Sequence, residues 1–261
     1  MPVVQLGSAA IHYELSGKGP LVVLLHEIGG TLDTWKPVAA LMPGFRTLRY
    51  DQRGAGQSSR IASPFSLDTQ VDDIGALLDA LGEHDPVHIA GVALGAAFAV
   101  RFAAKNPQRV KSLVLACPAP GVDATRIDYL KIRADAVERE GMTATVENSL
   151  TNSYPPEVRR DPEAFAAYRA RFLANDPKSY AAINRAFADF DVTPDLSNIK
   201  CPALVLAGTY DRLRPPTFVH GIAAKIPNAR HAEIDSGHIM PVQAPQALAK
   251  AMTNFYAAIG S

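Results

Sequence analysis

The chain has 261 residues, of which 48% are hydrophobic, 20% charged and 7% aromatic, as in an ordinary globular protein with a large core. Twenty-six basic residues balance 26 acidic ones, and no run of Lys and Arg forms a basic stripe. Affinity for nucleic acids and for anionic membranes depends on clustered positive charge, so we expect neither as a partner. Disordered chains, collagens and disulfide-stapled small scaffolds are excluded as well.

No segment of the sequence has the length and apolar character of a membrane span. The longest apolar runs, such as 21–25 and 96–100, fall far short of the roughly 20 residues that cross a bilayer. The first residues lack the basic start and apolar stretch of a secretory signal. The two cysteines, Cys117 and Cys201, imply no disulfide framework and lack metal-ligand spacing. We therefore expect a cytoplasmic protein.

Short apolar runs alternate with helical stretches along most of the chain. The runs lie at 11–15, 21–25, 47–50, 87–90, 113–116, 203–207 and 232–234, and helical stretches lie at 67–81, 94–105 and 245–258. Runs such as Leu-Val-Val-Leu-Leu are continuous rather than alternating, which is typical of strands buried on both faces. The order predicts the α/β class, with a mostly parallel sheet and helices on both of its faces.

One interval, 121–200, interrupts this rhythm. It contains amphipathic stretches at 129–140, 162–173 and 178–190 but no good strand run. We interpret it as a helical cap inserted over the sheet, so that residues 1–120 and 201–261 form the core domain. The cap carries 11 basic and 13 acidic residues and is therefore mildly acidic.

A turn between a strand and a helix has the spacing of a catalytic motif. The strand at 87–90 leads into Gly91-Val92-Ala93-Leu94-Gly95 and then directly into a helix of small residues. This context matches the nucleophile elbow, G-x-S-x-G, in which the central residue sits in a strained turn and the glycines prevent collisions with the neighbouring strand and helix. Taken alone, the pattern would indicate only a structural turn. Ala93 stands where the nucleophilic serine belongs.

An acid and a base follow in the chain order that such a site requires. Asp211 follows the strand at 203–207, and His238 follows the strand at 232–234. Both would lie at the carboxyl edge of the sheet, where open α/β folds place their ligands. His238 would take a proton from the nucleophile or from water, and Asp211 would orient the imidazole and stabilise its charged form. Asp123, which follows the strand at 113–116, is the competing candidate for the acid.

The early loop His26-Glu27-Ile28-Gly29-Gly30 supplies a further part of the site. Loops of this kind provide one backbone N–H for an oxyanion, and the residue after the nucleophile provides the other. We assign these two donors to Ile28 and Leu94. Glu27 would place a carboxylate beside the oxyanion, where a negative charge opposes the developing one unless the side chain turns away or is protonated.

Together these motifs resemble the α/β-hydrolase superfamily over nearly the whole chain, and the segment 50–58, Tyr-Asp-Gln-Arg-Gly-Ala-Gly-Gln-Ser, is similar to the family's D-x-R-G-x-G-x-S turn. Within the superfamily, the approach to Asp51, Trp35, the loop before Asp211 and the cap length look most like the 3-oxoadipate enol-lactonase group. The resemblance implies acyl transfer from small esters or lactones to the enzyme and then to water, with Ala93, Asp211 and His238 at the triad positions. This chemistry requires neither a cofactor nor a metal.

Three functions remain open at this point. The first is a serine hydrolase of small lactones or carboxylic esters, inactive here because alanine replaces the nucleophile. The second is an enzyme that naturally lacks the serine and uses His238 with Glu27 as an acid–base pair in a lyase, hydratase or isomerase reaction. The third is a non-catalytic protein that binds a small molecule. The sequence offers no argument about the oligomeric state.

Other residues have both structural and functional interpretations. Trp35 is a candidate wall of the substrate site or a packed core aromatic. His26 is expected to brace its loop, and Arg53 to stabilise the turn around it. Four cap arginines could hold a substrate carboxylate, although a solvated helix face is the simpler interpretation; they are Arg126, Arg133, Arg169 and Arg171.

Overall fold

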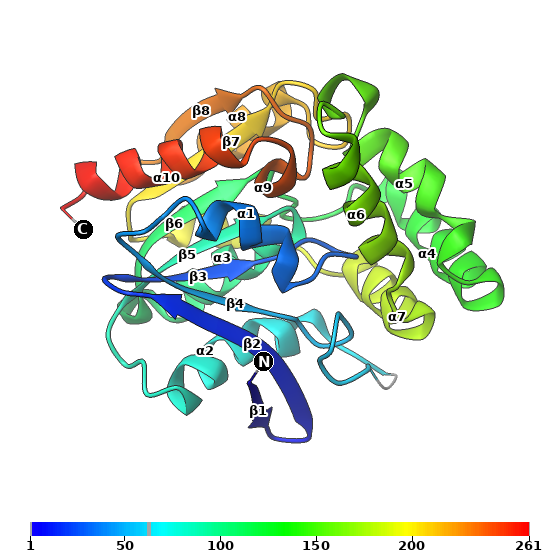
Figure 1. Ribbon diagram of the computed structural model, residues 1–261, viewed down its shortest axis with the longest axis horizontal. Coiled ribbons are helices and arrows are strands. Elements are labelled where there is room, and N and C mark those ends of the chain that lie inside the picture. Colours follow the sequence, from blue (N-terminus) through cyan, green and yellow to red (C-terminus); the bar gives the residue numbers. More distant parts are fainter. Residues whose placement is uncertain (1, 62–63, 261) are drawn as a thin grey trace.

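The computed structural model describes residues 2–61 and 64–260. An eight-stranded sheet runs through the molecule in the order β1-β2-β4-β3-β5-β6-β7-β8. The pairs β1 with β2 and β2 with β4 are antiparallel, and all the pairs from β4 to β8 are parallel. Helices cover both faces, and a group of further helices lies beside the sheet, at the right of Figure 1. The predicted α/β class is therefore confirmed.

The strands are β1 (Val3–Leu6), β2 (Ala9–Gly17), β3 (Leu21–Leu25), β4 (Arg46–Tyr50), β5 (Val87–Val92), β6 (Val110–Ala116), β7 (Ala203–Gly208) and β8 (Arg230–Ile234). The helices are α1 (Lys36–Ala39), α2 (Leu67–Ala80), α3 (Leu94–Lys105), α4 (Ala124–Glu140), α5 (Val146–Ser153), α6 (Pro162–Leu173), α7 (Pro177–Ala188), α8 (Pro216–Ala223), α9 (Met240–Gln243) and α10 (Pro245–Ala258). Short 3₁₀ helices occur at η1 (Leu32–Trp35), η2 (Pro107–Arg109), η3 (Met142–Ala144), η4 (Pro156–Val158) and η5 (Thr193–Asn198).

The continuous apolar runs are explained by burial on both faces of the sheet. In β3, Val23 and Leu25 join the core layer that contains α2, α3 and α8, whereas Val22 and Leu24 join the opposite layer with α1, α9 and α10. Successive residues of a strand point to opposite faces of the sheet. When helices cover both faces, every position is buried, and apolar and polar residues therefore do not alternate along the strand.

Five of the described strands and α-helices escaped the sequence analysis: β1, α1, α5, α8 and α9, of which α1 and α9 are only four residues long. Strand β1 lies at the edge of the sheet and its first residue, Val3, is exposed, and its run Val-Val-Gln-Leu is too short to stand out in the sequence. Helix α5 has eight residues, of which only Val146 and Leu150 are apolar, and α8 begins at Pro216 directly after Pro215, a pair that is typical of a turn. Helices α3, α6 and α10 end where they were predicted to end.

Helices α4 to α7 occupy the interval that was interpreted as a cap. They carry an apolar cluster of their own, which includes Val137, Leu150, Tyr154 and Phe172. This cluster also contacts Ile28 of the early loop, so the helices are packed onto the end of the sheet where β3 finishes. The division into a core and a cap remains our interpretation of this arrangement.

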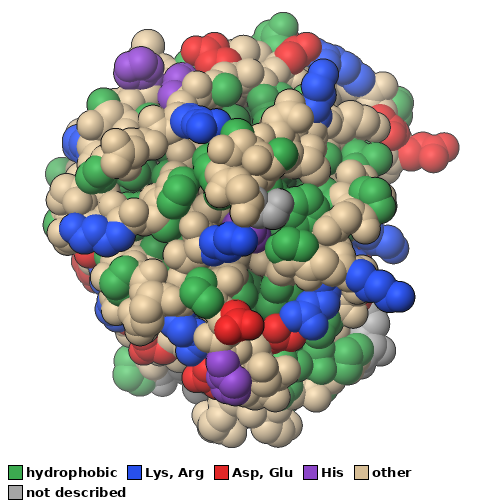
Figure 2. Space-filling view, turned by 90° about the vertical axis from the view of Figure 1, so that its left-hand side faces the viewer, with side chains coloured by type: hydrophobic (Ala, Val, Ile, Leu, Met, Phe, Trp, Pro, Cys, Tyr) green, Lys and Arg blue, Asp and Glu red, His purple; other side chains and the backbone are tan. Residues whose placement is uncertain are grey.

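The face of the molecule that lies away from these helices shows no concentration of one charge. Figure 2 shows basic, acidic and apolar side chains interspersed there. Among the described residues, no helix combines the length and the apolar character needed to cross a membrane.

Candidate active site

The turn between β5 and α3 holds Ala93 in a backbone conformation that is rare for a residue with a side chain. Its φ is 53° and its ψ is −115°, and it immediately precedes the first residue of α3. A Cβ atom on Gly91 would come within 2.4 Å of the backbone of Gly95, and one on Gly95 would come within 2.4 Å of the Leu25 carbonyl oxygen. The two glycines are therefore required, as the sequence motif predicted, for the strand, turn and helix to pack.

Asp211 and His238 come together at the carboxyl edge of the sheet. The Nδ1 atom of His238 lies 2.7 Å from Oδ2 of Asp211, and both side chains are buried. The other carboxylate oxygen accepts hydrogen bonds from the backbone N–H groups of Leu213, at 2.8 Å, and Arg214, at 2.9 Å. Burial raises the pKa of Asp211, but the attraction and hydrogen bond of His238 and the two N–H donors together hold it below its usual value.

This geometry assigns the ring nitrogens of His238. An ionised carboxylate can only accept, so Nδ1 carries the proton and donates it to Asp211. The Nε2 atom of the neutral ring is then free to accept a proton in the cavity. Asp123, the competing acid, caps the exposed start of α4 and accepts a hydrogen bond from Thr125 N–H instead.

Cys117 lies next to this pair, on the turn after β6. Its Sγ, a carboxylate oxygen of Asp211 and a ring nitrogen of His238 all lie within 4.8 Å of one another, a grouping that could in principle hold a metal ion. Burial and the neighbouring Asp211 raise the pKa of the thiol well above its usual value. A metal ligand needs the thiolate, and Asp211 already accepts three hydrogen bonds, so the residues present fit an acid–base pair better than a metal site.

Glu27 is buried beside the elbow and held by two hydroxyl groups. Its Oε1 accepts hydrogen bonds from Thr34, at 3.2 Å, and from Tyr168 of α6, at 2.9 Å. Among the described residues, its Oε2 has no hydrogen-bond partner although it is buried. Burial and the nearby carboxylate raise the pKa of Tyr168 well above its usual value, so its hydroxyl stays a donor. The side chain of Glu27 therefore does not turn away from the site.

A cavity of about 400 Å³ lies over these residues. Its lining includes Ala93, Leu94, Ile28, Glu27 and His238, together with residues of α4 to α7 and of the loops after β6 and β7. Leu94 is the first residue of α3, so its N–H has no acceptor within the helix. The cavity thus brings six of the seven predicted site residues into one neighbourhood, since Asp211 lies directly behind His238.

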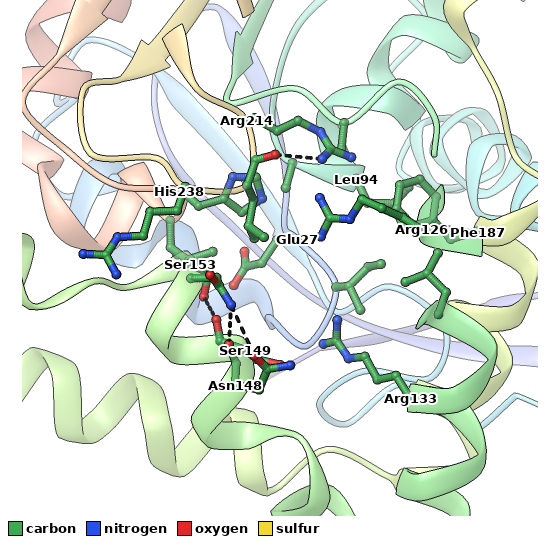
Figure 3. Close-up of a pocket in the computed structure, with 18 of the residues that line it drawn as sticks. Glu27, Leu94, Arg126, Arg133, Asn148, Ser149, Ser153, Phe187, Arg214 and His238 are labelled. Atoms are coloured by element: carbon green, nitrogen blue, oxygen red, sulfur yellow. Dashed lines mark hydrogen bonds between the residues drawn. The ribbon is translucent and has the colours of Figure 1, made fainter. Parts of the chain in front are cut away.

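Four arginine side chains also line the cavity: Arg126 and Arg133 of α4, and Arg212 and Arg214 of the loop after β7. Arg212 pairs with Glu157, but within residues 2–61 and 64–260 none of the other three takes part in an ion pair of 4.0 Å or less. Figure 3 shows Arg126 and Arg133 extending toward the cavity from the side opposite Glu27 and His238. Burial lowers the pKa of Arg133 and of Arg214, yet guanidinium groups keep their charge in proteins.

Two expectations about individual residues are therefore wrong. Trp35 does not line the cavity; it is fully buried in the core layer with α10 and donates its Nε1–H to the Leu25 carbonyl oxygen at 2.9 Å. The expectation that the cap arginines lie on a solvated helix face is wrong for Arg126 and Arg133, which line the cavity. It is correct for Arg169, whose exposed side chain pairs with Glu147.

The structural interpretations of two loop residues are confirmed. His26 accepts a hydrogen bond from the backbone N–H of Gln52 at 3.1 Å and so ties two loops together. Arg53 forms a two-pronged ion pair with Asp73, at 2.6 and 2.7 Å.

Comparison with known proteins decides the family. A family model described as the alpha/beta hydrolase fold matches residues 20–245. The chain belongs to the α/β-hydrolase family. One curated relative of this chain is the "Putative carbamate hydrolase RutD" of Azorhizobium caulinodans. The two sequences are 30% identical, and their alignment covers 91% of each chain. Another is 3-oxoadipate enol-lactonase 2 of Acinetobacter baylyi, which is 26% identical over 91% of this chain and 90% of the relative.

Solved structures give the same result. The enol-lactonase from Burkholderia xenovorans LB400 superimposes on this α/β-hydrolase with a TM-score of 0.91 at 28% identity, and the match covers 98% of this chain and all of the other. The predicted resemblance therefore holds for the superfamily, and relatives named enol-lactonase are among the matches. These relatives support an enzyme of the esterase or lactonase type.

The sequence analysis missed Tyr168 and Thr34, which hold Glu27. Tyr168 lies 141 residues from Glu27, and no local pattern connects a cap tyrosine to a loop carboxylate across such a separation. The two cavity arginines of α4 did leave a signal. Positions 126 and 133 are seven residues apart and so lie on one face of a helix, a spacing that Arg169 and Arg171 do not have.

Proposed function

We propose that this protein has the active site of a hydrolase of small lactones or carboxylic esters, in which alanine replaces the serine nucleophile of a Ser-His-Asp triad. The observation that carries the proposal is the pair formed by His238 and Asp211, at 2.7 Å, in the same cavity as the strained turn at Ala93. A methyl group cannot attack a carbonyl, so the covalent route is closed at Ala93.

With a serine at position 93, the elements around the cavity would serve the standard steps of acyl transfer. The Nε2 atom of His238 would accept the serine proton, and Asp211 would stabilise the imidazolium that results. The N–H groups of Ile28 and Leu94 would donate hydrogen bonds to the oxyanion, assisted at Leu94 by the positive end of α3. His238 would then protonate the leaving oxygen, and water would release the acid.

The unpaired arginines favour an ester or lactone that also carries a carboxylate. Arg126, Arg133 and Arg214 line the cavity without an ion pair, and within the described part of the chain the lining contains one acidic residue, Glu27. A guanidinium group binds a carboxylate through two parallel hydrogen bonds, which gives both affinity and orientation. Names of relatives that include an enol-lactonase and a carbamate hydrolase agree with a small polar substrate.

The decisive experiment is the variant Ala93→Ser. We expect it to hydrolyse members of a panel of small lactones and esters and to gain the mass of an acyl group when it is mixed with an activated ester. Ala93→Ser/His238→Gln is the matched control, which should retain the fold and lose the adduct. If Ala93→Ser gives neither turnover nor an adduct on any member of the panel, the proposal is wrong.

A further inference from the structure

We propose that the substrate carries its carboxylate in the acyl part, as in a monoester of a dicarboxylic acid, and that the alcohol it releases is uncharged. This assignment rests on the proposed function and adds the side of the ester bond on which the charge lies. Two unlike walls of the cavity support it: a cationic wall beside α4 and a neutral polar wall on α5.

The cationic wall is formed by the guanidinium groups of Arg126, Arg133 and Arg214. Arg126 and Arg133 lie seven residues apart on one face of α4. The Cζ atom of Arg133 lies 5.0 Å from the centre of the Tyr180 ring, on the neighbouring helix α7. Arg214 enters from the loop after β7 and donates a hydrogen bond of 3.2 Å to the carbonyl oxygen of Gly121, in the loop that leads into α4. The three groups therefore share one side of the cavity, and in Figure 3 Arg126 lies between the other two.

The charges of this wall repel one another. Within the described residues, none of the three arginines forms an ion pair of 4.0 Å or less. Burial lowers the pKa of Arg133 and of Arg214, and the charge of Arg126 lowers both further. The hydrogen bonds of Thr125 and the charges of Arg126 and Arg214 lower the pKa of Asp123, but this carboxylate is exposed and largely screened by solvent. A carboxylate bound inside the cavity would relieve the repulsion and accept hydrogen bonds from the guanidinium groups.

The wall beside His238 is polar and uncharged. Ser149, Asn152 and Ser153 of α5 line this part of the cavity. The backbone N–H of His238 donates a hydrogen bond of 3.2 Å to the carbonyl oxygen of Ser153, so the end of α5 and the base are direct neighbours. Hydroxyl and amide side chains suit an alcohol group, which has no charge to neutralise.

A carboxylate on the His238 side of the cavity would be disfavoured. Glu27, the acidic residue of the lining, lies on this side and opposite Arg126 in Figure 3. Arg212, the fourth arginine of the lining, is already paired with Glu157 at 2.7 Å. A negative group on the alcohol part would therefore be repelled by Glu27 and would have to compete with Glu157 for a cation.

The chemistry of His238 determines which part of the ester faces which wall. In Ala93→Ser, the serine oxygen would bond to the carbonyl carbon while its proton passes to Nε2 of His238. The bond from the carbonyl carbon to the alcohol oxygen then breaks, and His238 gives the proton to that oxygen. Water adds to the acyl group in the second step and releases the dicarboxylic acid. Because the leaving oxygen must reach His238, the alcohol part lies beside α5, and the acyl chain extends toward Arg126 and Arg133.

Two isomeric esters of equal charge test this assignment in Ala93→Ser. Ethyl hydrogen glutarate carries its carboxylate in the acyl part, whereas 3-(butanoyloxy)propanoate carries it in the alcohol part. We expect kcat/KM to be at least about 10-fold higher for the glutarate monoester. Adding Arg126→Met should reduce this preference at least about 3-fold, mainly by slowing the glutarate monoester.

Arg139→Met is the matched control, because Arg139 lies on the same helix with an exposed side chain that pairs with Glu140. It should leave the preference unchanged, and the unfolding midpoint of each variant checks the fold. If Ala93→Ser hydrolyses these esters with a smaller preference than expected, or if Arg126→Met does not reduce it, the assignment is wrong and the proposed function stands. If Ala93→Ser hydrolyses no ester or lactone of the panel, both fail.

Discussion

Tyr168 of helix α6 donates a hydrogen bond of 2.9 Å to Glu27, which lies 141 residues earlier in the loop after β3. The bond is buried, and it joins the helical layer to the sheet directly beside the elbow at Ala93. The position of the helices over the cavity and the orientation of the carboxylate are therefore coupled. A change at either residue should affect both the stability of the fold and the chemistry of the site.

The variant Tyr168→Phe tests this coupling. It removes one of the two donors to Oε1 and leaves the aromatic packing intact, so we expect a loss of about 1.5 to 3 kcal/mol in the free energy of unfolding. Urea denaturation measures the loss. Tyr129→Phe is the matched control, because the hydrogen bond that its hydroxyl accepts from Asn148 is exposed, and its effect should stay below about 0.5 kcal/mol. Equal effects of the two substitutions would contradict the coupling.

Gly30→Ala tests whether the loop is shaped around the carboxylate. The added methyl group would lie 2.5 Å from Oε1 of Glu27, so the carboxylate or the loop must move, at a cost of about 1 to 3 kcal/mol. Thermal or urea unfolding measures this cost. Gly44→Ala makes the same chemical change at an exposed turn where a Cβ atom has no neighbour within 4 Å, and we expect it to be nearly neutral. A neutral Gly30→Ala would mean that Glu27 is free to reorient.

The sheet and the elbow were predictable because their signals are local. Strand β5, the glycines around Ala93 and helix α3 follow one another within 20 residues, and burial on both faces leaves continuous apolar runs. The order of Ala93, Asp211 and His238 could be predicted for the same reason, since each residue lies within four residues of the end of a strand.

The walls of the cavity were much less predictable. Whether Trp35 points into the core or into the cavity depends on packing against α10, and nothing near Trp35 in the sequence encodes that contact. The mildly acidic net charge of the cap also gives no indication of the charge on its inner surface. Acidic residues such as Glu147 pair with arginines on the outside of the cap, here Arg169, whereas Arg133 lines the cavity. The net charge of a segment does not show which of its charged side chains face the cavity.

The cavity arginines should make ligand binding depend on charge. Arg133→Met removes the guanidinium group and keeps most of the apolar stem, so we expect at least a 10-fold increase in KM for an ester that carries a carboxylate and less than a 3-fold change for its neutral amide analogue. The measurement uses Ala93→Ser, or the unsubstituted chain if it hydrolyses the ester. Arg169→Met is the control, because Arg169 pairs with Glu147 on the surface. If KM changes equally for the carboxylate-bearing ester and for its neutral analogue, the substrate needs no carboxylate.

His88 should make the protein sensitive to mild acid. Burial lowers its pKa from 6.5 to about 4, with a smaller contribution from Lys111, and its ring packs on Tyr256 with centroids 4.5 Å apart. Between these two pH values the unfolded chain binds a proton that the folded chain does not bind, so stability falls as the pH drops from about 6.5 to about 4 and the loss levels off below that. The lost stability amounts to about 3 kcal/mol. Urea unfolding at several pH values should show that His88→Gln loses about 3 kcal/mol less over this range than the unsubstituted chain does, whereas His84→Gln, at an exposed position, loses as much as the unsubstituted chain. If the natural chain and His88→Gln decline in parallel, His88 is protonated in the folded state and the assigned direction of its pKa shift is wrong.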